Sequence, residues 1–152
     1  MKAKTIKTIK GISIAVMILM AAVTFLDLYF WTDRWQSVKW VDEFIGWQKS
    51  TIICYIVSTL MLTVALFYFI INILKGLRKG IIFNRINTFV IYAFAVIFFF
   101  YSFMQTSVEN VIEGKYVWSI NTNMLICPLI IIILGLLHKL AVEASEENNL
   151  TI

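Results

Sequence analysis

The chain offers few side chains whose type and spacing could perform chemistry. Its only histidine, His138, stands beside Lys139 with no nucleophile or carboxylate pair around it. The sequence contains no GxSxG, HExxH, phosphate-loop or dinucleotide fingerprint, so neither covalent nor metal-assisted catalysis has a candidate set of residues. We therefore predict that the protein is not an enzyme and that it has no metal or cofactor site.

The two cysteines, Cys54 and Cys127, leave two interpretations open. They lie far apart in the sequence and form no CxxC pair, and with a single histidine they do not support a structural zinc site. Both fall a few residues inside the same end of their helices, so a disulfide between them is one interpretation. The commoner one is a pair of buried thiols that act as small apolar residues, because a bridge needs α-carbons within about 7 Å.

Composition indicates that these side chains are held by a membrane protein. Of the 152 residues, 61% are hydrophobic and only 14% are charged, and there is a single proline. A soluble domain of this length would carry about 25% charged residues. The basic residues stand beside apolar runs without interleaved aromatics, so we predict no direct contact with nucleic acid.

Four charge-free runs, each near or above the ~20 residues that span a hydrocarbon core, predict four transmembrane helices. The expected spans are approximately residues 11–30, 51–74, 86–107 and 119–140. The runs lack the alternation of a barrel strand. We predict an all-α, integral membrane four-helix bundle that forms one domain over residues 1–152, with an acidic tail at 141–152.

The distribution of lysine and arginine predicts that both termini are cytoplasmic. Four basic residues precede the first span, and four more are packed into the eleven residues from Lys75 to Arg85. The loop from Asp27 to Lys49 spreads three basic residues among four acids, so its positive charge is more dilute. Side chains expected to anchor and orient the spans at the lipid interfaces are Lys75, Arg78, Arg85, Trp31 and Trp35.

The spans themselves show no ionisable residue in their middle, where a transport pathway usually places one. Hydroxyl and amide side chains are present, and they more often form hydrogen bonds between helices than line a path. The alternative is a polar seam that a homodimer would complete as a pathway. Its candidate residues are Ser58, Thr63, Asn72 and Gln105.

The segment Leu74 to Phe89, LKGLRKGIIFNRINTF, predicts a short cytoplasmic turn between the second and third spans. Gly76 and Gly80 interrupt the helical pattern, and Asn84 is placed to cap the next helix. On the same face the chain ends in VEASEENNLTI, where nothing stops the fourth helix from continuing into water. Acids of this tail could therefore pair with the basic turn.

These two segments resemble the signatures of the bacterial membrane family known as domain of unknown function 2975. Lys79, Gly80 and Phe83 match a K-G-x-x-F turn, and the last three residues match a terminal L-T-I. The resemblance implies a small four-span protein of the bacterial cytoplasmic membrane. It also implies a partner, because members are commonly encoded beside a small helix-turn-helix regulator of the Cro/C1 type.

We therefore predict a non-enzymatic membrane protein that binds or sequesters such a regulator through its cytoplasmic turn and tail. An acidic helix that ends in an apolar tripeptide suits a basic surface or a hydrophobic groove. The alternative is a small transporter or exporter subunit that works as a homo-oligomer. Candidate partner-binding residues are Lys79, Gly80, Phe83, Asn84, Glu146, Glu147, Leu150, Thr151 and Ile152.

Overall fold

Four long helices account for most of the chain. The computed structural model describes residues 3–79, 84–120 and 122–150. Its helices are α1 (Ala3–Ser37), α2 (Ile45–Lys79), α3 (Arg85–Ile112) and α4 (Thr122–Leu150), with a short 3-10 helix, η1 (Asp42–Phe44), before α2. Each long helix has at least 28 residues and is long and apolar enough to cross a membrane. The all-α class and the predicted number of four helices of membrane-spanning length are confirmed.

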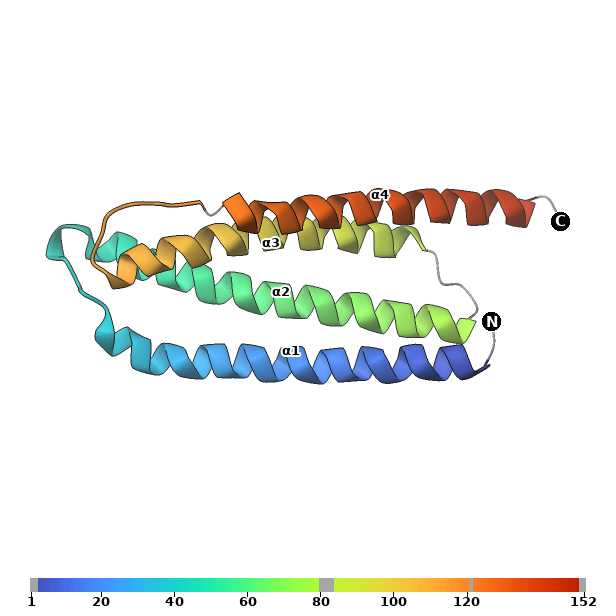
Figure 1. Ribbon diagram of the computed structural model, residues 1–152, viewed down its shortest axis with the longest axis horizontal. Helices are drawn as coiled ribbons and strands as arrows, with labels where there is room; N and C mark the ends of the chain where they lie inside the picture. The colour runs from blue at the N-terminus through green and yellow to red at the C-terminus, as the bar shows by residue number, and fades with distance from the viewer. Residues whose placement is uncertain (1–2, 80–83, 121, 151–152) are drawn as a thin grey trace.

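The helices pack in the order of the sequence. α1 packs against α2, α2 against α3, and α3 against α4. Figure 1 shows the two chain ends on one side of the molecule, which we call the terminal end. The connections α1–α2 and α3–α4 lie on the other side, which we call the loop end. α4 projects beyond its neighbours at the terminal end (Figure 1).

A glycine permits the close approach of α3 and α4. A Cβ atom at Gly135 would lie 2.7 Å from Cε1 of Tyr92 and 3.2 Å from Cγ2 of Ile91. Nearer the terminal end, a hydrogen bond of 2.8 Å joins Thr88 Oγ1 to His138 Nδ1. Small residues and polar bonds of this kind hold helices together in lipid, where hydrophobic burial gives no net drive. Gly135 therefore sets the spacing of this pair.

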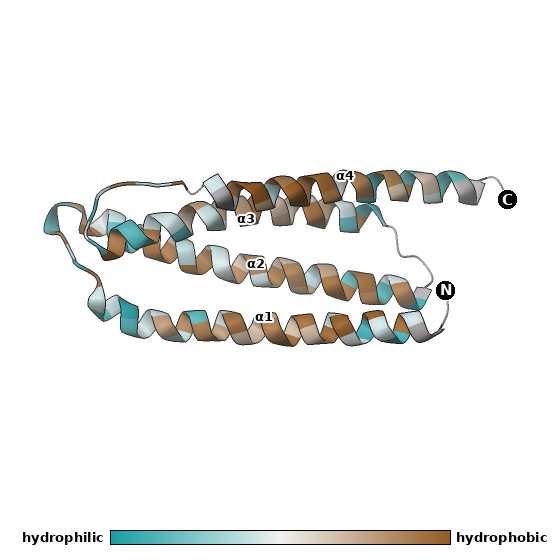
Figure 2. Cartoon of the chain, viewed as in Figure 1, coloured by the Kyte–Doolittle hydropathy of each residue, from teal (hydrophilic) through white to brown (hydrophobic). Residues whose placement is uncertain are grey.

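The outward surface is apolar along most of the length of the helices. Large side chains such as Phe25, Val64, Phe89, Val96 and Leu140 are each at least 60% exposed. Figure 2 shows this apolar character in the middle of the helices and polar residues toward their ends. A soluble protein rarely leaves so much apolar surface in water. The surface is that of a multi-pass membrane protein, with its backbone groups satisfied inside helices.

All four helices extend further than the predicted spans, at one end or at both. α1 continues seven residues beyond residue 30 and ends at Ser37, so Trp31 and Trp35 belong to the first helix and not to a loop. α2 passes through Gly76 and ends at Lys79. Asn84 caps α3 as predicted, with its Oδ1 accepting from the Ile86 N–H at 2.9 Å.

A buried glutamine organises the loop end. Gln48, in the first turn of α2, is fully buried. Its Oε1 accepts from the Val41 N–H at 3.0 Å, and its Nε2 donates to the carbonyls of Lys39 at 2.9 Å and Val111 at 3.2 Å. The Lys39 N–H also donates to the Ile112 carbonyl at 3.2 Å. The first connection is thereby fixed to α2 and to the end of α3.

α3 ends in a glycine turn that lies against this connection. Gly114 has φ of +76°, and the Lys115 N–H donates to the Asn110 carbonyl while the Gly114 N–H donates to the Val111 carbonyl. This pair of bonds defines a Schellman cap, in which glycine avoids the Cβ strain of the left-handed conformation. A Cβ at Gly114 would also lie 3.2 Å from the Lys39 carbonyl oxygen.

We expect Gln48→Met to lower the free energy of unfolding by about 1–3 kcal/mol. The substitution keeps the volume but leaves buried backbone groups of the connection and of α3 without a partner. Thermal unfolding of the purified protein in detergent measures the effect. Gln36→Met, at an exposed position of α1, is the matched control and should have little effect. Equal stability of the two variants would show that the Gln48 bonds do not hold the loop end.

Candidate functional site

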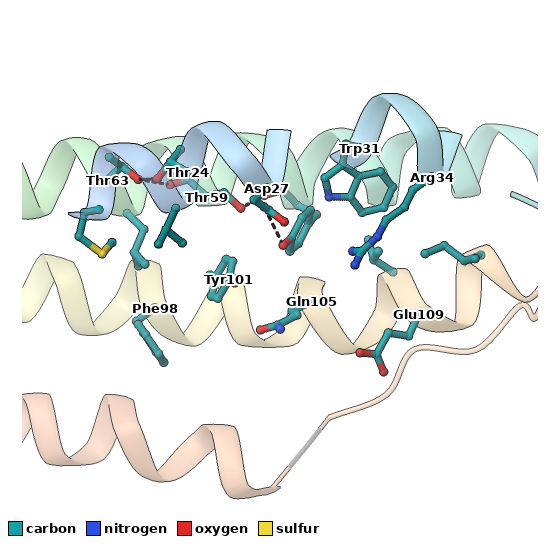
Figure 3. Close-up of a pocket in the computed structure, with 16 residues that line it drawn as sticks. Thr24, Asp27, Trp31, Arg34, Thr59, Thr63, Phe98, Tyr101, Gln105 and Glu109 are labelled. Atoms are coloured by element: carbon teal, nitrogen blue, oxygen red, sulfur yellow. Dashed lines mark hydrogen bonds between the residues drawn. The ribbon is translucent and has the colours of Figure 1, made fainter. Parts of the chain in front are cut away.

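A polar groove opens between α1 and α3 alongside α2, in the half of the molecule nearer the loop end. Its volume is about 530 Å³, within the ~300–1,000 Å³ usual for small-molecule sites. α1 packs on α2 but not extensively on α3, so side chains of all three helices line the space. Figure 3 draws the lining residues and labels ten of them, with Asp27 near the middle. The groove is the candidate site.

The Asp27 carboxylate is the central charge of this groove. Asp27 is partly buried on α1, and its Oδ2 accepts a hydrogen bond from the Tyr55 hydroxyl of α2 at 3.0 Å. Among the described residues, no lysine or arginine forms an ion pair with it. A partly buried carboxylate among apolar residues is costly unless a partner compensates it, so such acids often mark a functional position.

Three aromatic rings form a continuous wall beside the carboxylate. Tyr55 contacts Trp31 at 5.5 Å between ring centroids and Tyr101 at 5.7 Å, the second pair nearly parallel. All three rings line the groove, one from each of its helices. We call Trp31, Tyr55 and Tyr101 the aromatic wall. Faces of such rings attract cations through their quadrupole.

Threonine hydroxyls occupy the groove on the side toward the terminal end. The hydroxyls of Thr24 on α1 and Thr63 on α2 lie 2.7 Å apart, and a dashed line marks this bond in Figure 3. Thr63 and Thr59 also lie 3.1 Å from carbonyl oxygens four residues earlier in α2, to which their hydroxyls can donate. This agrees with the predicted role of hydroxyls as bonds within and between helices.

Trp31 has a different role from the predicted one. Predicted as a lipid anchor, it is only 4% exposed and packs against Tyr55, whereas Trp35 is 40% exposed and contacts Trp40. The anchoring role of Trp31 is therefore wrong, because α1 continues and turns this position toward α2. Its indole N–H is buried, and no described residue accepts it. Buried donors normally have a partner, so this one is available to a bound molecule.

Two opposite charges stand where the groove meets the loop end. Arg34 on α1 places its guanidinium 5.9 Å from the centroid of the Trp31 ring, and Glu109 lies across the groove on α3. Figure 3 shows the Arg34 side chain directed from α1 toward α3. With Asp27, the lining carries two acids and one base, an excess of one negative charge.

Sequence reasoning missed Asp27 because it treated this residue as the beginning of a loop. The available signal was the segment FLDLYFW, in which an acid stands alone among apolar residues. Of the four residues of the predicted polar seam, the groove includes Thr63 and Gln105. Ser58 is buried, and its hydroxyl donates to the Tyr55 carbonyl. Asn72 lies four turns of α2 beyond Ser58 and does not line the groove.

At the terminal end the structure joins the predicted turn to the predicted tail. Arg85, the first residue of α3, donates from Nε to Glu146 Oε1 at 2.9 Å and from Nη2 to Oε2 at 2.6 Å. This is the two-pronged arginine–carboxylate arrangement, which fixes orientation as well as distance. We call it the Arg85–Glu146 fork. It joins the last turns of α4 to the start of α3, and because both side chains are largely exposed it contributes only about 0–1 kcal/mol.

The other predicted residues of this end are only partly described. Lys75 and Arg78 are exposed on the last turns of α2, and Glu147 is exposed on α4. Lys79 ends α2, and Leu150 ends α4. Gly80, Phe83, Thr151 and Ile152 lie outside the described residues, so the family-like turn and terminal tripeptide stay predictions.

The two cysteines are free thiols, Cys54 partly buried and Cys127 exposed. They belong to α2 and α4, which are not neighbours in the packing order because α3 lies between them. The disulfide interpretation is therefore not supported, and for Cys127 the buried interpretation is not supported either.

Fold and surface together define a multi-pass α-helical membrane protein. Comparisons with protein-family models, with curated proteins and with solved structures found no match for the chain. Any proposal for the function of this membrane protein therefore depends on the residues described above.

We expect Asp27 and Tyr55 to be energetically coupled. Tyr55→Phe should lower the free energy of unfolding by about 0.5–2 kcal/mol, because the carboxylate loses its donor in a site shielded from water. In the Asp27→Asn background the same substitution should cost less, and the difference is measured by a double-mutant cycle. Tyr68→Phe, at an exposed position of α2, is the control. Additive effects of the two substitutions would contradict the coupling.

Proposed function

We propose that the protein is a non-enzymatic regulator in the bacterial cytoplasmic membrane that binds a small helix-turn-helix transcription regulator at its terminal end. In this proposal the terminal end faces the cytoplasm, and the bound regulator is kept away from DNA. The observation that carries the proposal is the Arg85–Glu146 fork. It makes one surface from the two segments whose sequences suggested a partner.

The charges of this surface suit a basic partner. α4 carries Glu143, Glu146 and Glu147 within its last two turns, and the side chains of Glu143 and Glu147 are exposed. Glu143 lies 3.8 Å from the Lys139 ammonium and Glu146 is paired with Arg85, so a basic partner would share these acids with the protein's own bases. Figure 1 shows this part of α4 projecting past the other helices, where a partner can reach it. DNA-binding surfaces are basic, so complementary potentials would favour and orient the encounter.

The fork supports the proposal by limiting the motion of α4. A helix that projects alone into water gains little stability by itself, because its packing face has no neighbour. Here a side chain of α3 holds it four residues before its end, at Glu146. A binding surface that is already ordered loses less conformational entropy when the partner binds.

The transporter alternative has weaker support. A pathway through the molecule would need polar lining from one end to the other, and the predicted seam is divided between the groove and separate positions. The groove extends from the loop end to about Met20 and Thr63. We therefore treat it as a binding site and not as part of a path.

Cysteine labelling tests the orientation. In a Cys54→Ser, Cys127→Ser background, a membrane-impermeant maleimide should label Lys115→Cys in intact spheroplasts. It should label Glu147→Cys only after the membrane is permeabilised, because the terminal end faces the cytoplasm. The reverse pattern would place the terminal end outside and exclude a cytoplasmic partner.

Charge exchange tests the partner surface. Arg85→Glu or Glu146→Arg alone should reduce the amount of regulator recovered with membranes, because each breaks the fork. The double exchange should restore recovery, since the fork can form with reversed polarity. Removal of residues 146–152 should release the regulator. Immunoblotting of membrane and soluble fractions measures each case.

Glu113→Arg is the matched control for this experiment, because it changes the same charge at the loop end. There the Lys115 ammonium, which bonds to Glu113, lowers the pKa of that carboxyl below its ordinary value. Recovery should be unchanged in this variant. Equal recovery of the regulator without the tail and with Lys75, Arg78 and Arg85 neutralised would contradict the proposed function.

A further inference from the structure

The groove beside Asp27 combines three features that a purely structural site does not need. It is a cavity of about 530 Å³, and it holds a carboxylate without a basic partner among the described residues. A third feature, the aromatic wall, lines the same space. A packed helix interface would close the space and pair the charge. We infer that the groove binds an organic ammonium ion that carries an apolar tail.

The residues in the middle of the groove indicate that the head of this ligand is a cation. The Asp27 carboxylate supplies the counter-charge, and the aromatic wall of Trp31, Tyr55 and Tyr101 lies directly beside it. Aromatic rings around a carboxylate are the usual means of recognising alkylated ammonium ions, which are too weakly hydrated to need a cage of oxygen atoms. An anionic head would instead meet the excess negative charge of the lining.

The residues at the end of the groove nearer the middle of the helices indicate that the tail of the ligand is apolar. From Asp27 toward the middle of the helices the apolar lining residues are Met20, Val23, Leu62 and Phe98. The threonines of this end are bonded to one another or to carbonyls of α2, so their hydroxyls do not require a polar ligand. An amphiphile entering from the loop-end leaflet would place its alkyl chain here and its charge at Asp27. The ligand would then have the same orientation as the lipids of that leaflet. Its alkyl chain would lie among apolar groups, and its charged head would lie nearer the water.

The order of charges disfavours a zwitterionic phospholipid as the ligand. In such a lipid the phosphate lies between the chains and the ammonium group. With its chains among the apolar residues, the phosphate would lie at the level of Asp27, where like charges repel. The ammonium would then reach the loop end of the groove, where Arg34 repels it and Glu109 attracts it, so the repulsion between the phosphate and Asp27 decides. A single-chain amine without phosphate avoids that repulsion.

This inference does not depend on the partner-binding proposal, because the groove lies toward the loop end and the fork lies at the terminal end. Its failure would leave the proposed function intact. Failure of the proposed function would likewise leave the ligand inference intact, since ligand binding is measured on the purified chain without any regulator.

Equilibrium dialysis of radiolabelled octyltrimethylammonium tests the inference. The full chain is placed in nanodiscs of a neutral lipid, and binding to empty nanodiscs is subtracted. We expect saturable binding of one ion per chain. Unlabelled octyltrimethylammonium should displace it, whereas 1-octanol and octyl sulfate, which share the tail, should not. Absence of saturable binding, or equal displacement by octanol, would overturn the inference.

Variants locate the ion at the groove. Asp27→Asn keeps the side-chain shape and an acceptor for Tyr55 but removes the charge, and it should weaken binding at least tenfold. Asp33→Asn, an exposed acid two turns further along α1, is the matched control and should change binding less than twofold. Equal affinities of the wild type and Asp27→Asn would overturn the assignment.

A second variant keeps the inference testable if Asp27→Asn does not fold. Tyr101→Leu retains the carboxylate and removes one ring of the aromatic wall, and it should weaken binding several-fold for octyltrimethylammonium. Phe99→Leu, an exposed aromatic residue of α3, is its control. An unchanged affinity in Tyr101→Leu would remove the aromatic wall from the site and contradict the ligand class.

Discussion

The geometry of the loop end depends on one fully buried side chain, Gln48. In the membrane-spanning part, helices satisfy their own backbone groups, but a connection between helices cannot do so. Gln48 resolves this by bonding to the backbone at two points of the first connection, Lys39 and Val41, and at the end of α3. Three chain segments are thus held in one arrangement, and the loop end of α1 is fixed relative to α3.

That arrangement is what leaves the groove open. At the loop end Gln48 joins Lys39, just after α1, to Val111 of α3, and along its length α1 is bonded to α2 through Thr24 and Asp27. Polar bonds hold α1 at defined points without filling the space between α1 and α3. A helix held only by close packing of apolar side chains would have no such gap.

The two ends of the molecule use charge differently. At the loop end a carboxylate within the helices is satisfied by a tyrosine hydroxyl and surrounded by aromatic rings, which suits a small cation. At the terminal end the charges are exposed, and one arginine–glutamate fork joins distant segments into a surface. The enclosed charge at the loop end favours a small ligand that leaves water to bind. The exposed charges at the terminal end favour a macromolecule that approaches from water.

The sequence by itself determined the class of the protein, the number of spans, the Asn84 cap and the proximity of the basic turn to the acidic tail. These follow from the composition, from the length of the apolar runs and from the fact that successive connections of a four-span chain lie on opposite sides of the membrane. Only the tertiary structure decided that Arg85 meets Glu146, that Trp31 faces inward and that Asp27 belongs to a groove. The reason is physical: the length of α1 and its rotation about its axis depend on contacts with α2, and no local pattern in residues 27–37 records those contacts.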